Sequence, residues 1–69
     1  MSVVLFESIS HALRAEKIIK AAQISCKLIP VPRHLSSDCG VCLRFSTDAK
    51  YQITNILQGK LDFFEIKLL

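Results

Sequence analysis

The residues of this chain that are able to do chemistry gather between Pro32 and Cys42, in the stretch PRHLSSDCGVC. Two of the three cysteines, Cys39 and Cys42, lie here with Arg33 and His34. A cysteine reacts as its thiolate, and nearby positive charge favours that form. If the turn brings its two ends together, Arg33 and His34 approach Cys39. The stretch therefore predicts a loop that presents Cys39 as a reactive thiol.

Four further residues of the loop affect the reactivity of Cys39. Ser36 and Ser37 can donate hydrogen bonds to a charged sulfur, and Gly40 lets a partner or substrate come close because it has no side chain. Asp38 acts in the opposite direction, since a neighbouring carboxylate disfavours the thiolate. The alternative is an ordinary β-turn with an incidental cysteine, and the residues alone leave both interpretations open.

The CxxC spacing of Cys39 and Cys42 raises the possibility of a thiol–disulfide pair, with Cys42 as a resolving thiol. In such redox sites the motif opens a helix, whose N-terminus stabilises the thiolate. Here the motif leads into a predicted strand instead. Extended residues at this spacing lie about 10 Å apart, whereas a disulfide needs Cα atoms within about 7 Å. The two thiols can join only if Gly40 bends the chain.

A zinc site is a further possibility, because Cys26, Cys39, Cys42 and His34 are all zinc-ligand types. The chain holds only one CxxC pair, and no second pair answers it. Cys26 falls on one face of a predicted strand, where a small core residue is expected. We therefore predict no metal site and no cofactor.

Hydrophobic periodicity places this loop inside a strand–helix–strand–strand–helix–strand chain. Alternating apolar residues mark strands, and apolar residues three and four apart mark helices. The predicted strands are residues 2–6, 24–32, 41–45 and 62–69, and the predicted helices are residues 8–23 and 46–60. This order is typical of the ferredoxin-like fold. We expect one α+β domain over residues 1–69: a βαββαβ sandwich whose four-stranded antiparallel sheet carries both helices on one face.

The ends of the helices have recognisable signals. Ser8 or Ser10 is expected to cap the first helix, and Asp48 or Ser46 the second, because their side chains can accept from free backbone amides. Gly59 is expected to end the second helix.

One particular strand is expected at an edge of the sheet, and one face of the sheet is expected to be bare. Pro30 and Pro32 favour an edge position for residues 24–32, since proline cannot donate to a ladder. The face away from the helices has no predicted cover within the chain, although apolar residues point to it, such as Leu69. Such a patch marks a contact surface, and we expect a homodimer through this open sheet face.

Composition excludes several classes of protein. The chain has 69 residues, of which 51% are hydrophobic, and a net charge of +3. Its lysines and arginines are spread without a run, which does not favour nucleic acid, and no apolar stretch is long enough to cross a membrane. Three cysteines form no closed disulfide framework, and the start lacks a signal peptide. We expect a cytoplasmic protein with free thiols.

Two segments resemble the small selenium/sulfur (Se/S) carrier protein-like family, a domain of otherwise unknown function. They are ALRAE at residues 12–16 and PRHLSSDCG at residues 32–40. The resemblance covers nearly the whole chain. It implies that a cysteine, here Cys39, accepts sulfur or selenium as a persulfide or selenopersulfide and passes it to a partner enzyme. Cys42 departs from the family, in which a small or apolar residue is expected at that position.

Three functions follow from these observations, with the carrier first. As a carrier, the domain would present Cys39 to sulfur- or selenium-handling enzymes. The alternative is a non-catalytic interaction or ligand-sensing module that binds a protein or small anion through the open sheet face and the Arg33 loop. A thiol–disulfide redox protein that uses Cys39 and Cys42 comes third.

Overall fold

Strands and helices alternate along the chain in the predicted order. A computed structural model describes residues 1–35, 40–61 and 64–69. The elements are β1 (Ser2–Leu5), α1 (Ile9–Ala21), β2 (Cys26–Pro30), β3 (Val41–Phe45), the 3₁₀ turn η1 (Thr47–Ala49), α2 (Lys50–Gln58) and β4 (Glu65–Leu68). Among these elements, neither helix has the length and apolar character needed to cross a membrane.

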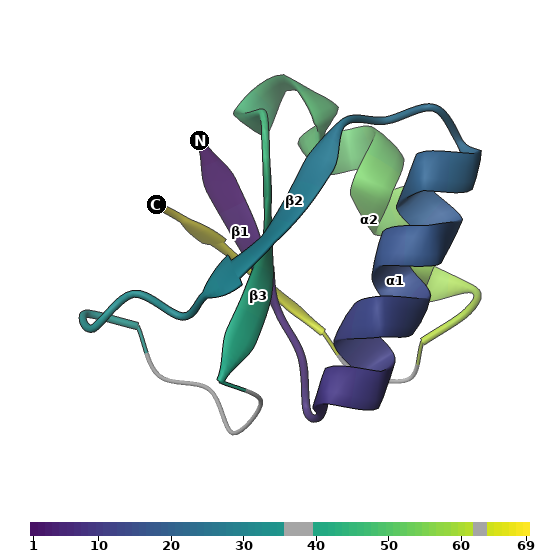
Figure 1. Cartoon of the computed structure of the whole chain (residues 1–69). Coiled ribbons are helices and arrows are strands. Elements are labelled where there is room, and N and C mark those ends of the chain that lie inside the picture. Colours follow the sequence, from purple (N-terminus) through teal and green to yellow (C-terminus); the bar gives the residue numbers. More distant parts are fainter. Residues whose placement is uncertain (36–39, 62–63) are drawn as a thin grey trace.

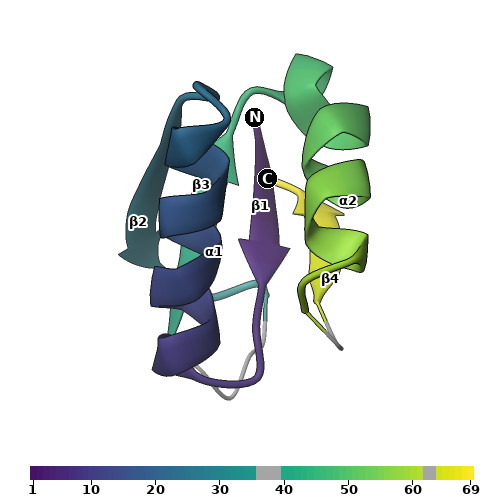
Figure 2. The same cartoon turned by 90° about the vertical axis from the view of Figure 1, so that its right-hand side faces the viewer.

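The strands form one antiparallel sheet in the order β2-β3-β1-β4. Both helices lie on the same face of this sheet (Figure 1), and Figure 2 looks onto the helices with the sheet behind them. The predicted ferredoxin-like α+β fold is therefore confirmed. β2 lies at an edge, as its prolines predict, and Pro30 ends the strand opposite Val41.

The main core lies between the sheet and the two helices. It takes alternate residues of the central strands, such as Val4 from β1 and Leu43 and Phe45 from β3, and one stripe from each helix. Its buried residues are Val4, Phe6, Ala12, Ala15, Ile19, Leu43, Phe45, Ile53, Leu57 and Leu61. Since a fully buried large apolar side chain stabilises a fold by about 1.5–3 kcal/mol, this core supplies most of the driving force for folding.

The ends of α1 are fixed by local hydrogen bonds. Ser8 is the N-cap, and its Oγ accepts from the backbone N–H of His11 at 3.4 Å. At the other end Gln23 adopts a left-handed backbone with φ of 63°. Its N–H donates to Lys20 O at 2.9 Å, and the N–H of Ile24 donates to Ile19 O at 3.2 Å. These two bonds are those of a Schellman motif, which usually carries glycine at the Gln23 position.

The start of α2 differs from the prediction. Ser46 precedes η1 with an extended backbone, but no side-chain cap bond forms there or at Ala49, and Asp48 lies inside the turn. The predicted side-chain cap is therefore wrong. The reason is that a 3₁₀ turn leads into the helix, closed by the backbone bond from Ala49 N to Ser46 O at 2.9 Å. Gly59 is the C-cap of α2, as predicted.

The sheet face away from the helices is not bare, which corrects a second prediction. Val3 and Cys42 are fully buried there and Leu5 is nearly so. Val31 and Leu35, from the connection between β2 and β3, pack against them. The chain thus covers part of its own open face, because apolar side chains after β2 reach back over the sheet.

The left-handed residue at the end of α1 gives a test of this helix boundary. Replacing Gln23 by glycine relieves the strain of a side chain at positive φ, and we expect the free energy of unfolding to rise by about 0.5–1 kcal/mol. Gln52 is exposed within α2, so Gln52→Gly should lower it by about 0.5–1 kcal/mol. Urea unfolding of both variants measures the two values. Destabilisation of similar size by both would contradict the assigned cap.

Candidate functional site

The cysteine-bearing loop begins and ends at a closed base. The backbone N–H of Val31 donates to Gly40 O at 3.1 Å, which continues the β2–β3 ladder by one bond. Gly40 has a φ of 81°, a left-handed backbone conformation. A Cβ on Gly40 would meet no atom within 4 Å. Glycine is therefore required there for its backbone conformation rather than for space.

The first half of the loop presents two polar side chains to solvent. The N–H of Leu35 donates to Pro32 O at 3.0 Å and closes a turn. Arg33 and His34 occupy the middle of this turn, and both are exposed. The remaining predicted loop residues, Ser36, Ser37, Asp38 and Cys39, lie outside the described residues. The structure thus describes the two ends of the predicted loop and not its centre, and the predicted site residues stay a prediction.

Cys42 lies beneath the loop. Its side chain belongs to the buried cluster on the open face, 0% exposed, with Val31 and Leu35 packed against that cluster. Its Cα partners in the sheet are Leu5 on β1 and Ile29 on β2. A thiol in this place reaches no external partner while the cover is closed. The proposed resolving role for Cys42 therefore requires Leu35 and Val31 to move.

Cys26 faces the opposite side of the sheet. It packs against the main core under α1 and is half-buried. Burial raises the pKa of its thiol, the Glu16 carboxylate adds to the rise, and the Lys20 ammonium opposes it. Lys20 is itself paired with Glu16 at 3.3 Å, so its charge is largely balanced. Cys26 is therefore protonated at neutral pH.

The two described thiols cannot share a metal ion, because they lie on opposite faces of the sheet. Among residues 1–35, 40–61 and 64–69, no three His, Cys, Asp or Glu side chains come close enough to hold one.

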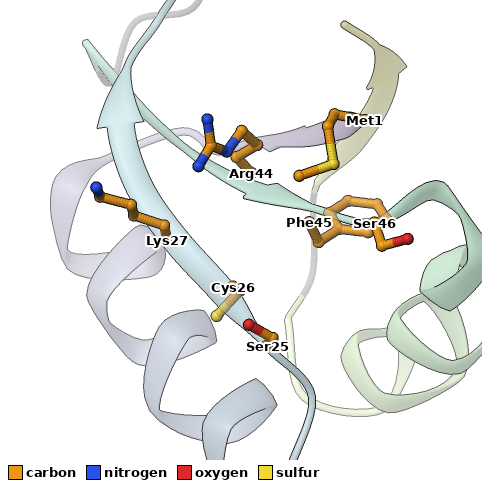
Figure 3. Close-up of a pocket in the computed structure, with 7 residues that line it drawn as sticks. All are labelled: Met1, Ser25, Cys26, Lys27, Arg44, Phe45 and Ser46. Carbon is orange, nitrogen blue, oxygen red and sulfur yellow. The ribbon is translucent and has the colours of Figure 1, made fainter.

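A second polar site, which sequence reasoning missed, lies at the other end of β2 and β3. A pocket of about 340 Å³ opens there (Figure 3), lined by Met1, Ser25, Cys26, Lys27, Arg44, Phe45 and Ser46. Lys27 and Arg44 are direct cross-strand partners. The register of the hairpin could have predicted this pairing. Once Pro30 pairs with Val41, an antiparallel ladder pairs Lys27 with Arg44.

Three cationic residues of the open face lie in one row across the sheet. Lys27, Arg44, Val3 and Lys67 are successive Cα partners on β2, β3, β1 and β4. Lys67 is paired with Glu65 at 3.3 Å. Within the part of the chain that the structure describes, no carboxylate pairs with Lys27 or Arg44. The positive charge of the pocket is therefore left unbalanced by these residues.

Comparison with known proteins finds one relationship. The model of the family described as "Putative Se/S carrier protein-like" matches residues 1–66. The match includes the loop, all four strands to Ile66 and both helices. No curated protein and no solved structure matches the chain.

Because Cys42 is buried, its reaction with a thiol reagent is expected to depend on opening of the apolar residues packed around it. In a Cys26→Ser/Cys39→Ser background, Cys42 should react slowly with a thiol reagent because it is buried. Leu35→Ala removes part of the cover, and each 1.4 kcal/mol lost from it raises the open population tenfold. We expect about tenfold faster labelling, measured by mass spectrometry. Leu13→Ala, at an exposed leucine of α1, should leave the rate unchanged; equal acceleration by both variants would rule out a local cover.

The raised pKa of Cys26 predicts its pH dependence. At pH 8 the thiolate fraction is smaller than for an ordinary cysteine, so iodoacetamide should alkylate Cys26 more slowly than an unstructured cysteine peptide. The half-rise of the rate should come at a higher pH than for the peptide. The measurement uses the Cys39→Ser/Cys42→Ala variant. If the alkylation rate of Cys26 reached half its maximum at the same pH as for the peptide, or at a lower pH, burial would not be what sets the pKa of this thiol.

Proposed function

Because the chain belongs to the Se/S carrier protein-like family, we propose that it carries sulfur or selenium on Cys39, as a persulfide or selenopersulfide, and passes it to a partner enzyme. The family match over residues 1–66 is the observation that carries this proposal. The partner is a sulfur- or selenium-handling enzyme, and the setting is a reducing compartment such as the cytoplasm, where the thiol stays free.

The transfer needs only thiol exchange chemistry. The Cys39 thiolate attacks the terminal sulfur of a donor persulfide, the S–S bond of the donor breaks, and the donor leaves as a thiolate with the bonding electron pair. Delivery repeats the step in the other direction: an acceptor nucleophile takes the terminal sulfur, and Cys39 is regenerated as a thiolate. No outside oxidant or reductant enters, and the selenium reaction has the same balance.

The surroundings of the other two thiols support the choice of Cys39. Cys42 is fully buried and Cys26 is half-buried with a raised pKa. A persulfide acceptor must meet its donor as a thiolate, and neither of these side chains is suited to that. Cys39 belongs to a connection whose described part carries the exposed Arg33 and His34. A cationic side chain of this kind favours an ionised sulfur.

The pocket of about 340 Å³ is lined at the far end of β3, among Ser25 to Lys27 and Arg44 to Ser46. A carrier needs no pocket around its thiol, since the partner enzyme supplies the acceptor and shields the reaction. Loops give such partners access.

A second candidate is the ligand-binding module, which the unbalanced Lys27–Arg44 pair favours. It does not compete with the carrier for residues, because the pair lies at the end of the hairpin far from the loop base at Val31 and Gly40. The homodimer through the open face stays a prediction. Among the described residues, Met1 and Leu69 are exposed apolar side chains next to β1 and β4, 58% and 44% exposed.

The test is intact-mass spectrometry after incubation with a cysteine desulfurase and cysteine. Wild type should gain one sulfur, which dithiothreitol removes. Cys39→Ser should gain none, while Cys26→Ser and Cys42→Ala should behave as wild type. Release to a thiol acceptor should be unchanged in Cys42→Ala if Cys42 takes no part in delivery, and slower if it resolves the persulfide.

Other results would redirect the assignment. Sulfur on Cys39→Ser but not on Cys26→Ser would move the carrier thiol to Cys26. A loss of two hydrogens from wild type, absent in Cys42→Ala, would show a Cys39–Cys42 disulfide and favour the redox protein. No adduct with either a sulfur or a selenium donor, with all thiols shown to be free, would contradict the carrier proposal.

A further inference from the structure

We propose that the pocket at the far end of β2 and β3 binds the phosphate group of a small phosphate monoester. The groups that carry this proposal are the Lys27 and Arg44 side chains, with the hydroxyls of Ser25 and Ser46 beside them. The site lies outside the cysteine loop and is independent of the carrier role.

The first argument is charge. Lys27 and Arg44 are directly opposite each other on adjacent antiparallel strands. Side chains in such a pair start about 4.5–5.5 Å apart at Cβ, and like charges there destabilise a sheet. Within the described residues no carboxylate pairs with either cation. A repulsive pair with no counter-charge is a cost to the free protein that a bound dianion removes.

The second argument is the choice of donors. Arginine offers a planar fork of N–H groups that matches two oxygens of a phosphate, and lysine adds a compact charge. Ser25 and Ser46 line the same pocket, and their hydroxyls are donors of the kind that phosphate oxygens accept from. Figure 3 shows Lys27 on β2 next to Arg44 on β3, with Ser25 just before β2 and Ser46 just after β3. Two positive charges match the two negative charges of a phosphate monoester near neutral pH.

The third argument is the size and apolar lining of the pocket. Its volume of about 340 Å³ is larger than one phosphate group requires. Met1 lines one side and its side chain extends towards Arg44 (Figure 3). The exposed Met1 side chain offers an apolar surface beside the cations. The room and this surface suit the organic part of a monoester.

The rest of the open face explains why the charge is concentrated here. Lys67 lies in the same row but is neutralised by Glu65 at 3.3 Å. Val3, between Arg44 and Lys67, is fully buried and adds no charge. The unbalanced charge therefore belongs to β2 and β3. A second copy of the chain would bring the same cations to this surface, so charge complementarity favours an anion over self-association.

The experiment is a titration of ¹⁵N-labelled protein at fixed ionic strength, followed by amide chemical shifts. Phenyl phosphate is the probe for a monoester, inorganic phosphate for the free ion, and chloride the blank. We expect saturable shifts at residues 25–27 and 44–46, with phenyl phosphate binding at least several-fold more tightly than inorganic phosphate. The amide signals of Val31 and of residues 33–35, at the loop, should not shift.

The variants are matched by charge. Lys27→Gln and Arg44→Gln should each weaken phenyl phosphate binding about tenfold or more, since a hydrogen bond to a charged group contributes about 1.5–3 kcal/mol. Lys17→Gln, an exposed lysine of α1, and Lys67→Gln remove the same charge elsewhere and should change it less than twofold. Arg44→Lys keeps the charge but loses the fork, and should weaken binding several-fold.

A second measurement needs no ligand. If the pair is repulsive in the free protein, Lys27→Gln and Arg44→Gln should raise Tm by about 1–5 °C without phosphate. This combination, weaker binding with higher stability, is not expected of residues that serve the fold alone.

Several outcomes would overturn the proposal. Shifts that spread over all lysines and persist equally in Lys27→Gln and Lys17→Gln would mean a general charge effect. Inorganic phosphate binding as tightly as phenyl phosphate would exclude a monoester site. Shifts on residues 25–27 that depend on protein concentration, without phosphate, would assign the surface to self-association. None of these outcomes depends on whether Cys39 carries sulfur.

Discussion

Pairing of β1 with β3 in the middle of the sheet decides where the reactive and charged side chains of the described chain lie. Its register places Val4 opposite Leu43 and Leu5 opposite Cys42. Because neighbouring residues of a strand face opposite sides, Leu43 enters the main core while Cys42 and Arg44 face away from the helices. A slip by one residue would reverse this arrangement and put Arg44 in the core. Burial of Leu43 and Phe45 in the core therefore also determines that Cys42 and Arg44 lie on the opposite face of β3.

The sheet also separates the two described thiols, Cys26 and Cys42, by placing them on opposite faces. Persulfides exchange with neighbouring thiols, so a carrier with three cysteines has to keep two of them out of the reaction. Strand alternation sends Cys26 to the helix side and Cys42 to the open side. Burial then limits the access to both, and in Cys26 it also disfavours the thiolate. In the proposed carrier, packing of Cys26 and Cys42 would therefore leave the reaction to Cys39.

Local sequence patterns predicted the strands, the helices, the edge position of β2 and the faces of each strand, because periodicity and proline act within a few residues. They failed where the outcome depends on contacts between distant segments. The cover over Cys42 depends on where Val31 and Leu35 pack after the chain turns. The pocket depends on the pairing of Lys27 with Arg44, which needs the register of the hairpin. The α2 cap failed because a 3₁₀ turn replaced a side-chain bond. The surroundings of Cys39 lie outside the described residues.

The two ends of β3 have different surroundings. At its start, Val41 follows the cysteine loop and Cys42 is buried. At its end, Arg44, Phe45 and the following Ser46 line a charged pocket. Four residues of extended strand put about 13 Å between Val41 and Phe45. β3 is hydrogen-bonded on both sides, to β1 and β2, so its extended backbone holds this separation fixed. The proposed anion site and the cysteine loop therefore lie at separate ends of one strand, and a substitution at Arg44 is expected to leave the backbone at Gly40 unchanged.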